Sequence, residues 1–93
     1  MNLYLTEPMI SAAAAPMPDM PLRPGERGSE VRTLQRLLRA AGYALEIDGV
    51  FGRITLTCVR SFQASHELPR DGVVGPCTWR ALQAVCKEVM TDE

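Results

Sequence analysis

The sequence Asp48-Gly49-Val50-Phe51-Gly52-Arg53-Ile54-Thr55 is echoed 23 residues later by Asp71-Gly72-Val73-Val74-Gly75-Pro76-Cys77-Thr78. Each copy contains an Asp-Gly pair, a second Gly three residues after the first, and a Thr three residues further on. Each copy then continues into a segment with the periodicity of an amphipathic helix. The repeated unit is therefore a loop followed by a helix. The sequence predicts an all-α fold, a small three-helix bundle with two Asp-Gly loop-helix pseudo-repeats.

Three segments have apolar residues at helical spacing, and we expect helices at about 30–41, 53–65 and 76–89. Ser29 is the candidate N-cap of the first helix, and Gly42 is its stop signal. In the second helix Ile54 falls within the apolar arc. In the third, Trp79 falls at the boundary of the arc and is expected to be half exposed.

The 93 residues allow one small domain. Residues 1–21 contain four prolines and no sustained apolar period, so we expect a flexible lead there, a domain at 22–90 and a tail at 91–93. The net charge of −1 offers no field to attract nucleic acid or an acidic membrane surface. No stretch approaches the length of a membrane-spanning helix. The sequence thus predicts neither a nucleic-acid nor a membrane partner.

The cysteines and the single histidine do not form a recognisable metal site. Cys77 and Cys86 lie on one predicted helix and cannot bridge each other, and Cys58 falls on an apolar face, so we expect reduced thiols. No C-x-x-C motif or His/Cys cluster is present, so no metal and no cofactor are predicted. His66 is expected at the surface, at the end of the second helix.

The repeated threonines point to a structural role for the loops. Thr55 and Thr78 each fall inside an apolar arc, where a hydroxyl without a hydrogen-bond partner costs about 1–3 kcal/mol. We expect each hydroxyl to bond the backbone of its own loop, and each Asp to accept bonds from N–H groups two or three residues on. The residues assigned to this loop motif are Asp48, Gly49, Gly52, Thr55, Asp71, Gly72, Gly75 and Thr78.

A further ordered set of residues precedes, separates and follows the two copies. It consists of Leu22, Gly25, Gly28, Val31, Leu34-Gln35, Leu38 and Gly42, then Val59, Phe62-Gln63 and Leu68, then Trp79 and Leu82. Together with the repeated stretches, this set resembles the type 1 family of peptidoglycan-binding domains. These are three-helix modules attached to many cell-wall hydrolases, including phage endolysins. The resemblance covers about residues 22–85.

The resemblance implies non-catalytic binding of bacterial cell-wall peptidoglycan, through the glycan strand, the stem peptide or both. It also implies that the chain targets or anchors an associated cell-wall hydrolase. The chain departs from the family pattern at Arg53, where Pro is frequent, at Cys58, where Ala is frequent, and at Glu67, where Gly is frequent. No signal peptide is recognisable. We therefore expect synthesis in the cytoplasm, with action at the periplasm or cell wall after release or export.

The differences between the two copies indicate where a ligand would bind. A half-exposed Trp offers a flat face to a sugar, and Arg53, at a helix N-terminus, suits a carboxylate of the stem peptide or lactyl group. Tyr43, just before the first loop, adds a hydroxyl. The predicted ligand-binding residues are Tyr43, Phe51, Arg53, Leu56 and Trp79.

Two other functions remain as alternatives. One is a small lytic enzyme acting on peptidoglycan through Asp48, Asp71 or Glu46. The equivalence of the two Asp loops argues against it, because an acid/base pair needs different environments, and no catalytic residue is predicted. The other is an interaction or nucleic-acid module that would use the exposed Arg stripe of the first helix, formed by Arg32, Arg36 and Arg39.

Overall fold

The computed structural model describes residues 17–91 of the chain, with side chains to residue 86. It contains three helices in this range: α2 (Ser29–Ala40), α3 (Arg53–Ser65) and α4 (Pro76–Thr91). Among the described residues there is no strand, only two isolated antiparallel bridges. The predicted all-α class and three-helix architecture are confirmed. The expectations for residues 1–16 and 92–93 lie outside the described residues.

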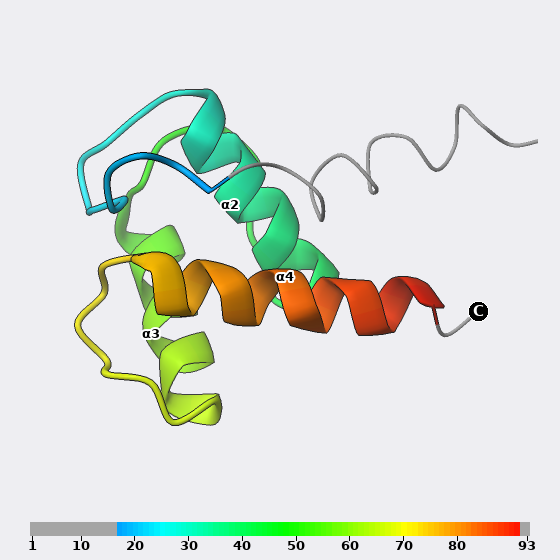
Figure 1. Cartoon of the computed structure of the whole chain (residues 1–93). Coiled ribbons are helices and arrows are strands. Elements are labelled where there is room, and N and C mark those ends of the chain that lie inside the picture. Colours follow the sequence, from blue (N-terminus) through cyan, green and yellow to red (C-terminus); the bar gives the residue numbers. More distant parts are fainter. Residues whose placement is uncertain (1–16, 92–93) are drawn as a thin grey trace, which may run out of the picture.

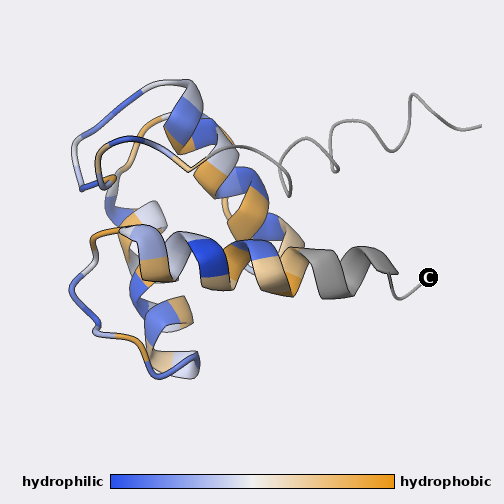
Figure 2. Cartoon of the chain, viewed as in Figure 1, coloured by the Kyte–Doolittle hydropathy of each residue, from blue (hydrophilic) through white to orange (hydrophobic). Residues whose placement is uncertain are grey.

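The helices surround a single apolar core. Helix α2 contacts both α3 and α4, and α4 crosses in front of α2 in the view of Figure 1. In Figure 2 hydrophobic and hydrophilic residues alternate along α2 and α3, as expected of helices with one buried side. None of the described helices has the length and apolar character needed to span a membrane. The core residues are Leu22, Val31, Leu34, Leu37, Leu38, Phe51, Cys58, Val59, Phe62, Val74, Trp79, Leu82 and Cys86.

Loops contribute to this core as well as helices, and this accounts for the first of two wrong predictions. Trp79 is 1% exposed rather than half exposed. Leu22, Phe51 and Val74 extend the core beyond the helices to the end where Trp79 lies, and a helical wheel takes no account of them. Ile54 is 63% exposed, because the buried side of α3 is centred on residues further round the helix: Thr55, Cys58, Val59, Phe62 and Gln63.

The N-terminal segment 22–28 binds both repeated loops through its backbone. Leu22 exchanges two hydrogen bonds with Val74, at 3.1 and 2.9 Å. Phe51 accepts a bond from the N–H of Gly25 and donates its own N–H to Glu26, both at 2.9 Å. Three loops therefore meet at one end of the bundle, visible at the left of Figure 1.

The same pairing determines where α2 begins. Gly28, with φ 130°, is the N-cap, and Ser29 is the first helical residue without any side-chain cap bond. The prediction of Ser29 as N-cap is therefore wrong. The Gly28 N–H donates to the carbonyl of Gly49 at 2.9 Å, and the Gly28 carbonyl accepts from Arg32. Pairing with the first loop thus fixes the helix start without help from a hydroxyl.

Helices α2 and α3 end in the same motif. After α2, Tyr43 N–H donates to Leu38 O and Gly42 N–H to Arg39 O, both at 3.0 Å, and Gly42 has φ 106°. This is a Schellman motif with Gly at the left-handed position, and it confirms Gly42 as the stop signal.

Helix α3 repeats this arrangement with a different residue at the left-handed position. Leu68 N–H donates to Gln63 O at 2.8 Å, and Glu67 N–H donates to Ala64 O at 3.3 Å. Glu67 has φ 57°, the only positive value of a non-Gly residue among those described. A side chain in this conformation costs roughly 1–2 kcal/mol.

Replacing Glu67 with Gly should therefore stabilise the protein. We expect the Glu67→Gly variant to gain about 0.5–1 kcal/mol in the free energy of unfolding, because relief of backbone strain exceeds the greater chain entropy of Gly. Urea denaturation measures the difference. Glu67→Gln, which removes the charge but keeps the strain, should show no gain. A loss of stability in the Gly variant would refute the strain argument.

Candidate functional site

The first loop is held by one buried side chain, Gln35 of α2, which is 1% exposed. Its Oε1 accepts the N–H of Gly49 at 2.9 Å. Its Nε2 lies 3.0 Å from Asp48 Oδ1, 3.1 Å from the carbonyl of Val50 and 3.0 Å from Thr55 Oγ1. A single amide thus joins α2, the loop and the start of α3.

The second loop is held in the same way by Gln63 of α3, also 1% exposed. Its Oε1 accepts the N–H of Gly72 at 3.1 Å. Its Nε2 lies 3.2 Å from Asp71 Oδ1, 3.1 Å from Val73 O and 3.1 Å from Thr78 Oγ1. We call each set of bonds a glutamine clamp.

Both clamps allow only one orientation of the amide. Carboxylate and carbonyl oxygens only accept, and a backbone N–H only donates, so Nε2 must face the Asp and the carbonyl. The two N–H bonds of Nε2 serve three acceptors, so at least one of them is shared.

The hydrogen bonds expected of both Asp residues are present, and those expected of the Thr residues differ from the prediction. Asp48 accepts the N–H of Val50, and Asp71 that of Val73, each at 3.0 Å. Thr55 reaches its own loop only at 3.5 Å, from Oγ1 to the Val50 carbonyl. Thr55 has its shorter bond with Gln35, and Thr78 is bonded by Gln63. Sequence analysis missed one signal: α2 and α3 each have a Gln on the buried side of the helix, Gln35 and Gln63.

Among the motif glycines, only the first of each copy requires a positive φ. Gly49 and Gly72 have φ 77° and 75°. A Cβ on Gly49 would lie 2.9 Å from Arg32 Nε, and one on Gly72 would lie 2.6 Å from Leu56 Cδ1. Gly52 and Gly75 have open space around them. Their carbonyls accept the first backbone bonds of α3 and α4.

Helix α4 carries a variant of the clamp position. Cys86 lies eight residues after Thr78, as Gln63 does after Thr55. Its thiol donates to the carbonyl of Leu37 at 3.4 Å, and burial raises its pKa to about 11. All three cysteines are free, with Cys77 exposed, and among the described residues no group of His, Cys, Asp and Glu could hold a metal.

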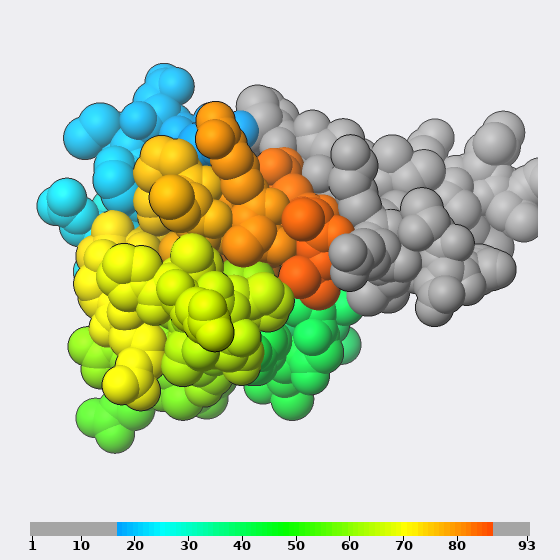
Figure 3. All heavy atoms as spheres, turned by 60° about the horizontal axis from the view of Figure 1, so that its bottom comes forward, coloured from blue at the N-terminus to red at the C-terminus, as the bar shows by residue number. Residues whose placement is uncertain are grey.

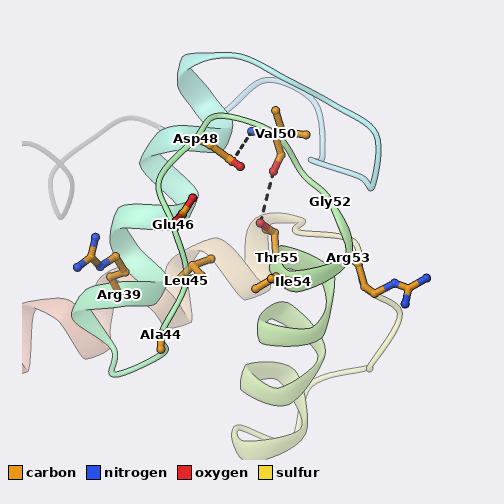
Figure 4. Close-up of a pocket in the computed structure, with 10 residues that line it drawn as sticks. All are labelled: Arg39, Ala44, Leu45, Glu46, Asp48, Val50, Gly52, Arg53, Ile54 and Thr55. Atoms are coloured by element: carbon orange, nitrogen blue, oxygen red, sulfur yellow. Dashed lines mark hydrogen bonds between the residues drawn. The ribbon is translucent and has the colours of Figure 1, made fainter.

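A shallow open groove of about 750 Å³ lies between the first loop and the start of α3. In Figure 4 the Leu45 and Ile54 side chains occupy its middle, Glu46 lies beside α2, and Arg39 and Arg53 extend outward at opposite sides. The groove is lined by Arg39, Ala44, Leu45, Glu46, Asp48, Val50, Gly52, Arg53, Ile54 and Thr55.

The structure separates the predicted ligand-binding residues into surface and core. Arg53 is exposed and lines the groove. Leu56 is half-buried, and half-buried Tyr43 packs edge-on against Phe62, with ring centroids 6.4 Å apart. Phe51 and Trp79 are each 1% exposed. They can support the loops but offer no outer face to a ligand, although Trp79 Nε1 is buried with no partner among the described residues.

Sequence analysis gave no ligand-binding role to Arg39, Leu45, Glu46 and Ile54. The sequence feature that could have pointed to these residues is the greater length of the first loop. Gln35 and Asp48 are 13 residues apart, whereas Gln63 and Asp71 are only 8 apart. The extra residues of the first loop supply one wall of the groove.

The fold and the two clamps define a small three-helix module with paired loop-helix repeats. Residues 27–82 match the family model described as a putative peptidoglycan binding domain, and the chain belongs to that family. This confirms the resemblance on which the sequence-based expectation depended.

Three related proteins illustrate the context of this module. A zinc D-Ala-D-Ala carboxypeptidase of Streptomyces albus G is 41% identical over 66 residues, which are 66% of this chain and 25% of the enzyme. The crystal structure of the Burkholderia AP3 phage endolysin superimposes with a TM-score of 0.68 at 49% identity, over 70% of this chain and 25% of the endolysin. The SleB N-terminal domain gives a TM-score of 0.73 at 33% identity, covering 76% of this chain and 99% of that domain. The chain thus spans about a quarter of the first two proteins.

Removing a clamp should destabilise the fold substantially. In Gln35→Leu the N–H of Gly49 loses its partner and the hydroxyl of Thr55 keeps only its 3.5 Å bond to the Val50 carbonyl, and we expect a loss of about 3 kcal/mol in the free energy of unfolding. Gln63→Leu should behave alike. Thr33→Val is the control, because the hydroxyl of the half-buried Thr33 makes an exposed bond to the Ser29 carbonyl within α2, and it should cost under about 0.5 kcal/mol. Equal effects of all three variants in urea denaturation would contradict the clamp.

The first clamp should also make stability depend on pH. Hydrogen bonds from the Val50 N–H and then the Gln35 amide hold the pKa of Asp48 below its ordinary value of 3.8. A lowered folded-state pKa stabilises the fold above the unfolded-state pKa of about 3.9, and this contribution disappears as pH falls through the folded value. Asp48→Asn should flatten the acid branch of a plot of melting temperature against pH. Parallel curves for the two proteins would contradict this role.

Proposed function

We propose that this chain binds peptidoglycan without cleaving it, through the groove beside the first loop, and so holds an attached cell-wall hydrolase on its substrate. The observation that carries the proposal is that the groove is lined by the segment before Asp48, which is five residues longer than the segment before Asp71 when counted from the clamping Gln. The related carboxypeptidase and endolysin, of which the chain spans a quarter, support a role as one module of a larger enzyme. Action at the bacterial cell wall follows from this proposal.

The composition of the groove favours the stem peptide over the sugar chain. Figure 4 places the apolar side chains of Leu45 and Ile54 between two arginines. Arg guanidinium groups pair with carboxylates, and the carboxylate of Glu46 suits an ammonium group. A peptide that carries carboxylates and an amino group has the matching charges. Trp79, the expected sugar platform, is buried.

The lytic alternative gains no support from Asp48. A general acid in glycoside hydrolysis needs a raised pKa, whereas the hydrogen bonds to Val50 and Gln35 lower that of Asp48. Asp71 sits in an equivalent clamp through Gln63. We therefore retain a purely binding role. On a zymogram containing embedded cell wall, a cleared band produced by this chain alone would overturn it.

Groove substitutions should weaken binding without unfolding the protein. Arg53 and Ile54 are both exposed, so Arg53→Gln and Ile54→Ser should leave the melting temperature nearly unchanged. We expect each to weaken binding to purified sacculi about fivefold, equivalent to about 1 kcal/mol. Co-sedimentation at graded protein concentrations measures the dissociation constant.

The matched control is Arg36→Gln, an exposed residue of α2 that does not line the groove. It should bind like the unaltered chain. Competition by a soluble stem peptide should displace the chain, whereas displacement only by peptide-free glycan would reject the preference for peptide. Unchanged binding in both groove variants would reject the groove itself.

A further inference from the structure

A second hollow lies on the opposite side of α3 from the core, away from the first loop. It has a volume of about 540 Å³ and is lined by Thr57, Arg60, Ser61, Ala64 and Arg70. Four of these residues follow helical spacing on α3, and Arg70 comes from the loop that leads to the second Asp-Gly turn. Figure 3 shows the end of α3 (yellow-green) and this loop (yellow) adjoining each other at the front of the molecule.

The hollow concentrates positive charge that the described part of the chain leaves unneutralised. No ion pair involves Arg60 or Arg70 among the described residues, and no carboxylate lines the hollow. The nearest acid in sequence, Asp71, directs its Oδ1 to Gln63 and to the N–H of Val73. Two guanidinium groups are therefore available to an external anion.

The same combination of residue types recurs on α2. Ser29, Arg32 and Thr33 on α2 stand at the same positions, relative to Gln35, as Thr57, Arg60 and Ser61 do relative to Gln63. All but the half-buried Thr33 are exposed, where packing places little constraint on residue type. The residue after the Gln differs between the two helices: it is Arg36 in α2 and Ala64 in α3. The smaller side chain of Ala64 leaves space on the surface of α3.

We propose that the hollow on α3 binds the phosphate monoester group of a phosphorylated sugar, as a site separate from the groove. A phosphate monoester carries about −1.5 to −2 charges at pH 7, which matches two arginines, whereas a single carboxylate or a phosphodiester carries one. The two guanidinium groups and the Ser61 hydroxyl are suitable donors to phosphate oxygens, whereas the Thr57 hydroxyl already donates to the carbonyl of Arg53 at 3.0 Å. The hollow is larger than one phosphate needs, which leaves room for the attached sugar. Ala64 is its only apolar lining residue, so a lipid surface is disfavoured.

The test is a titration of the whole chain followed by its amide chemical shifts. Glucose 6-phosphate should shift the amides of residues 57–64 and 70, and should bind more tightly than inorganic phosphate. Acetate and dimethyl phosphate, each with one charge, should bind at least about tenfold more weakly. Equal binding of acetate would overturn the proposal, as would equal affinities for inorganic phosphate and the sugar phosphate.

Variants locate the site and separate it from the groove. Arg70→Gln, in an exposed loop, should weaken glucose 6-phosphate binding about tenfold, whereas Arg36→Gln should not. Ile54→Ser should leave phosphate binding unchanged, and Arg70→Gln should leave binding to phosphate-free sacculi unchanged. An Arg70→Gln chain that still binds the sugar phosphate normally would reject the site, whatever becomes of peptidoglycan binding.

Discussion

The amides of Gln35 and Gln63 are the interactions on which the arrangement of this small protein depends. Each lies in the core, where an unpaired polar group is costly and a satisfied one is strong. Each binds an Asp carboxylate, a backbone carbonyl, a backbone N–H and a Thr hydroxyl at once. The amide thus fixes the loop by hydrogen bonds, in addition to the apolar contacts that Phe51 of the first loop and Val74 of the second make in the core. A domain of this size has few such contacts to spare.

The sequence was sufficient to predict the helices and the hydrogen bonds of the two Asp residues, because both depend on local patterns. The bounds of α3 agree with the prediction, and Gly42 ends α2 as expected. The errors arose where distant segments meet. Backbone pairing between Gly28 and Gly49 replaces a cap by Ser29, and loop residues belong to the same core as Trp79. A helical wheel of a single helix takes no account of contacts from other segments, so it predicts neither result.

The candidate site was only partly predictable for the same reason. Arg53 was identified from the difference between the two copies, and it lies at the groove. Phe51 was identified in the same way, but it is a core residue. A difference between repeats reflects either a ligand or a change in packing, and only the three-dimensional arrangement distinguishes the two. Arg39 and Leu45 come from segments outside the compared stretch, so the comparison could not include them.

Because of the clamps, the length of the loop before each Asp can vary while the fold stays the same. The two Gln-to-Asp spacings differ by five residues, yet the bonds made by the two amides agree closely in length. Residues between the end of a helix and the following Asp can therefore be inserted or removed while both anchoring points stay fixed. That freedom makes the segment before each Asp-Gly turn a natural place for new specificities to evolve. It also makes the shorter second loop a site into which a recognition sequence could be grafted.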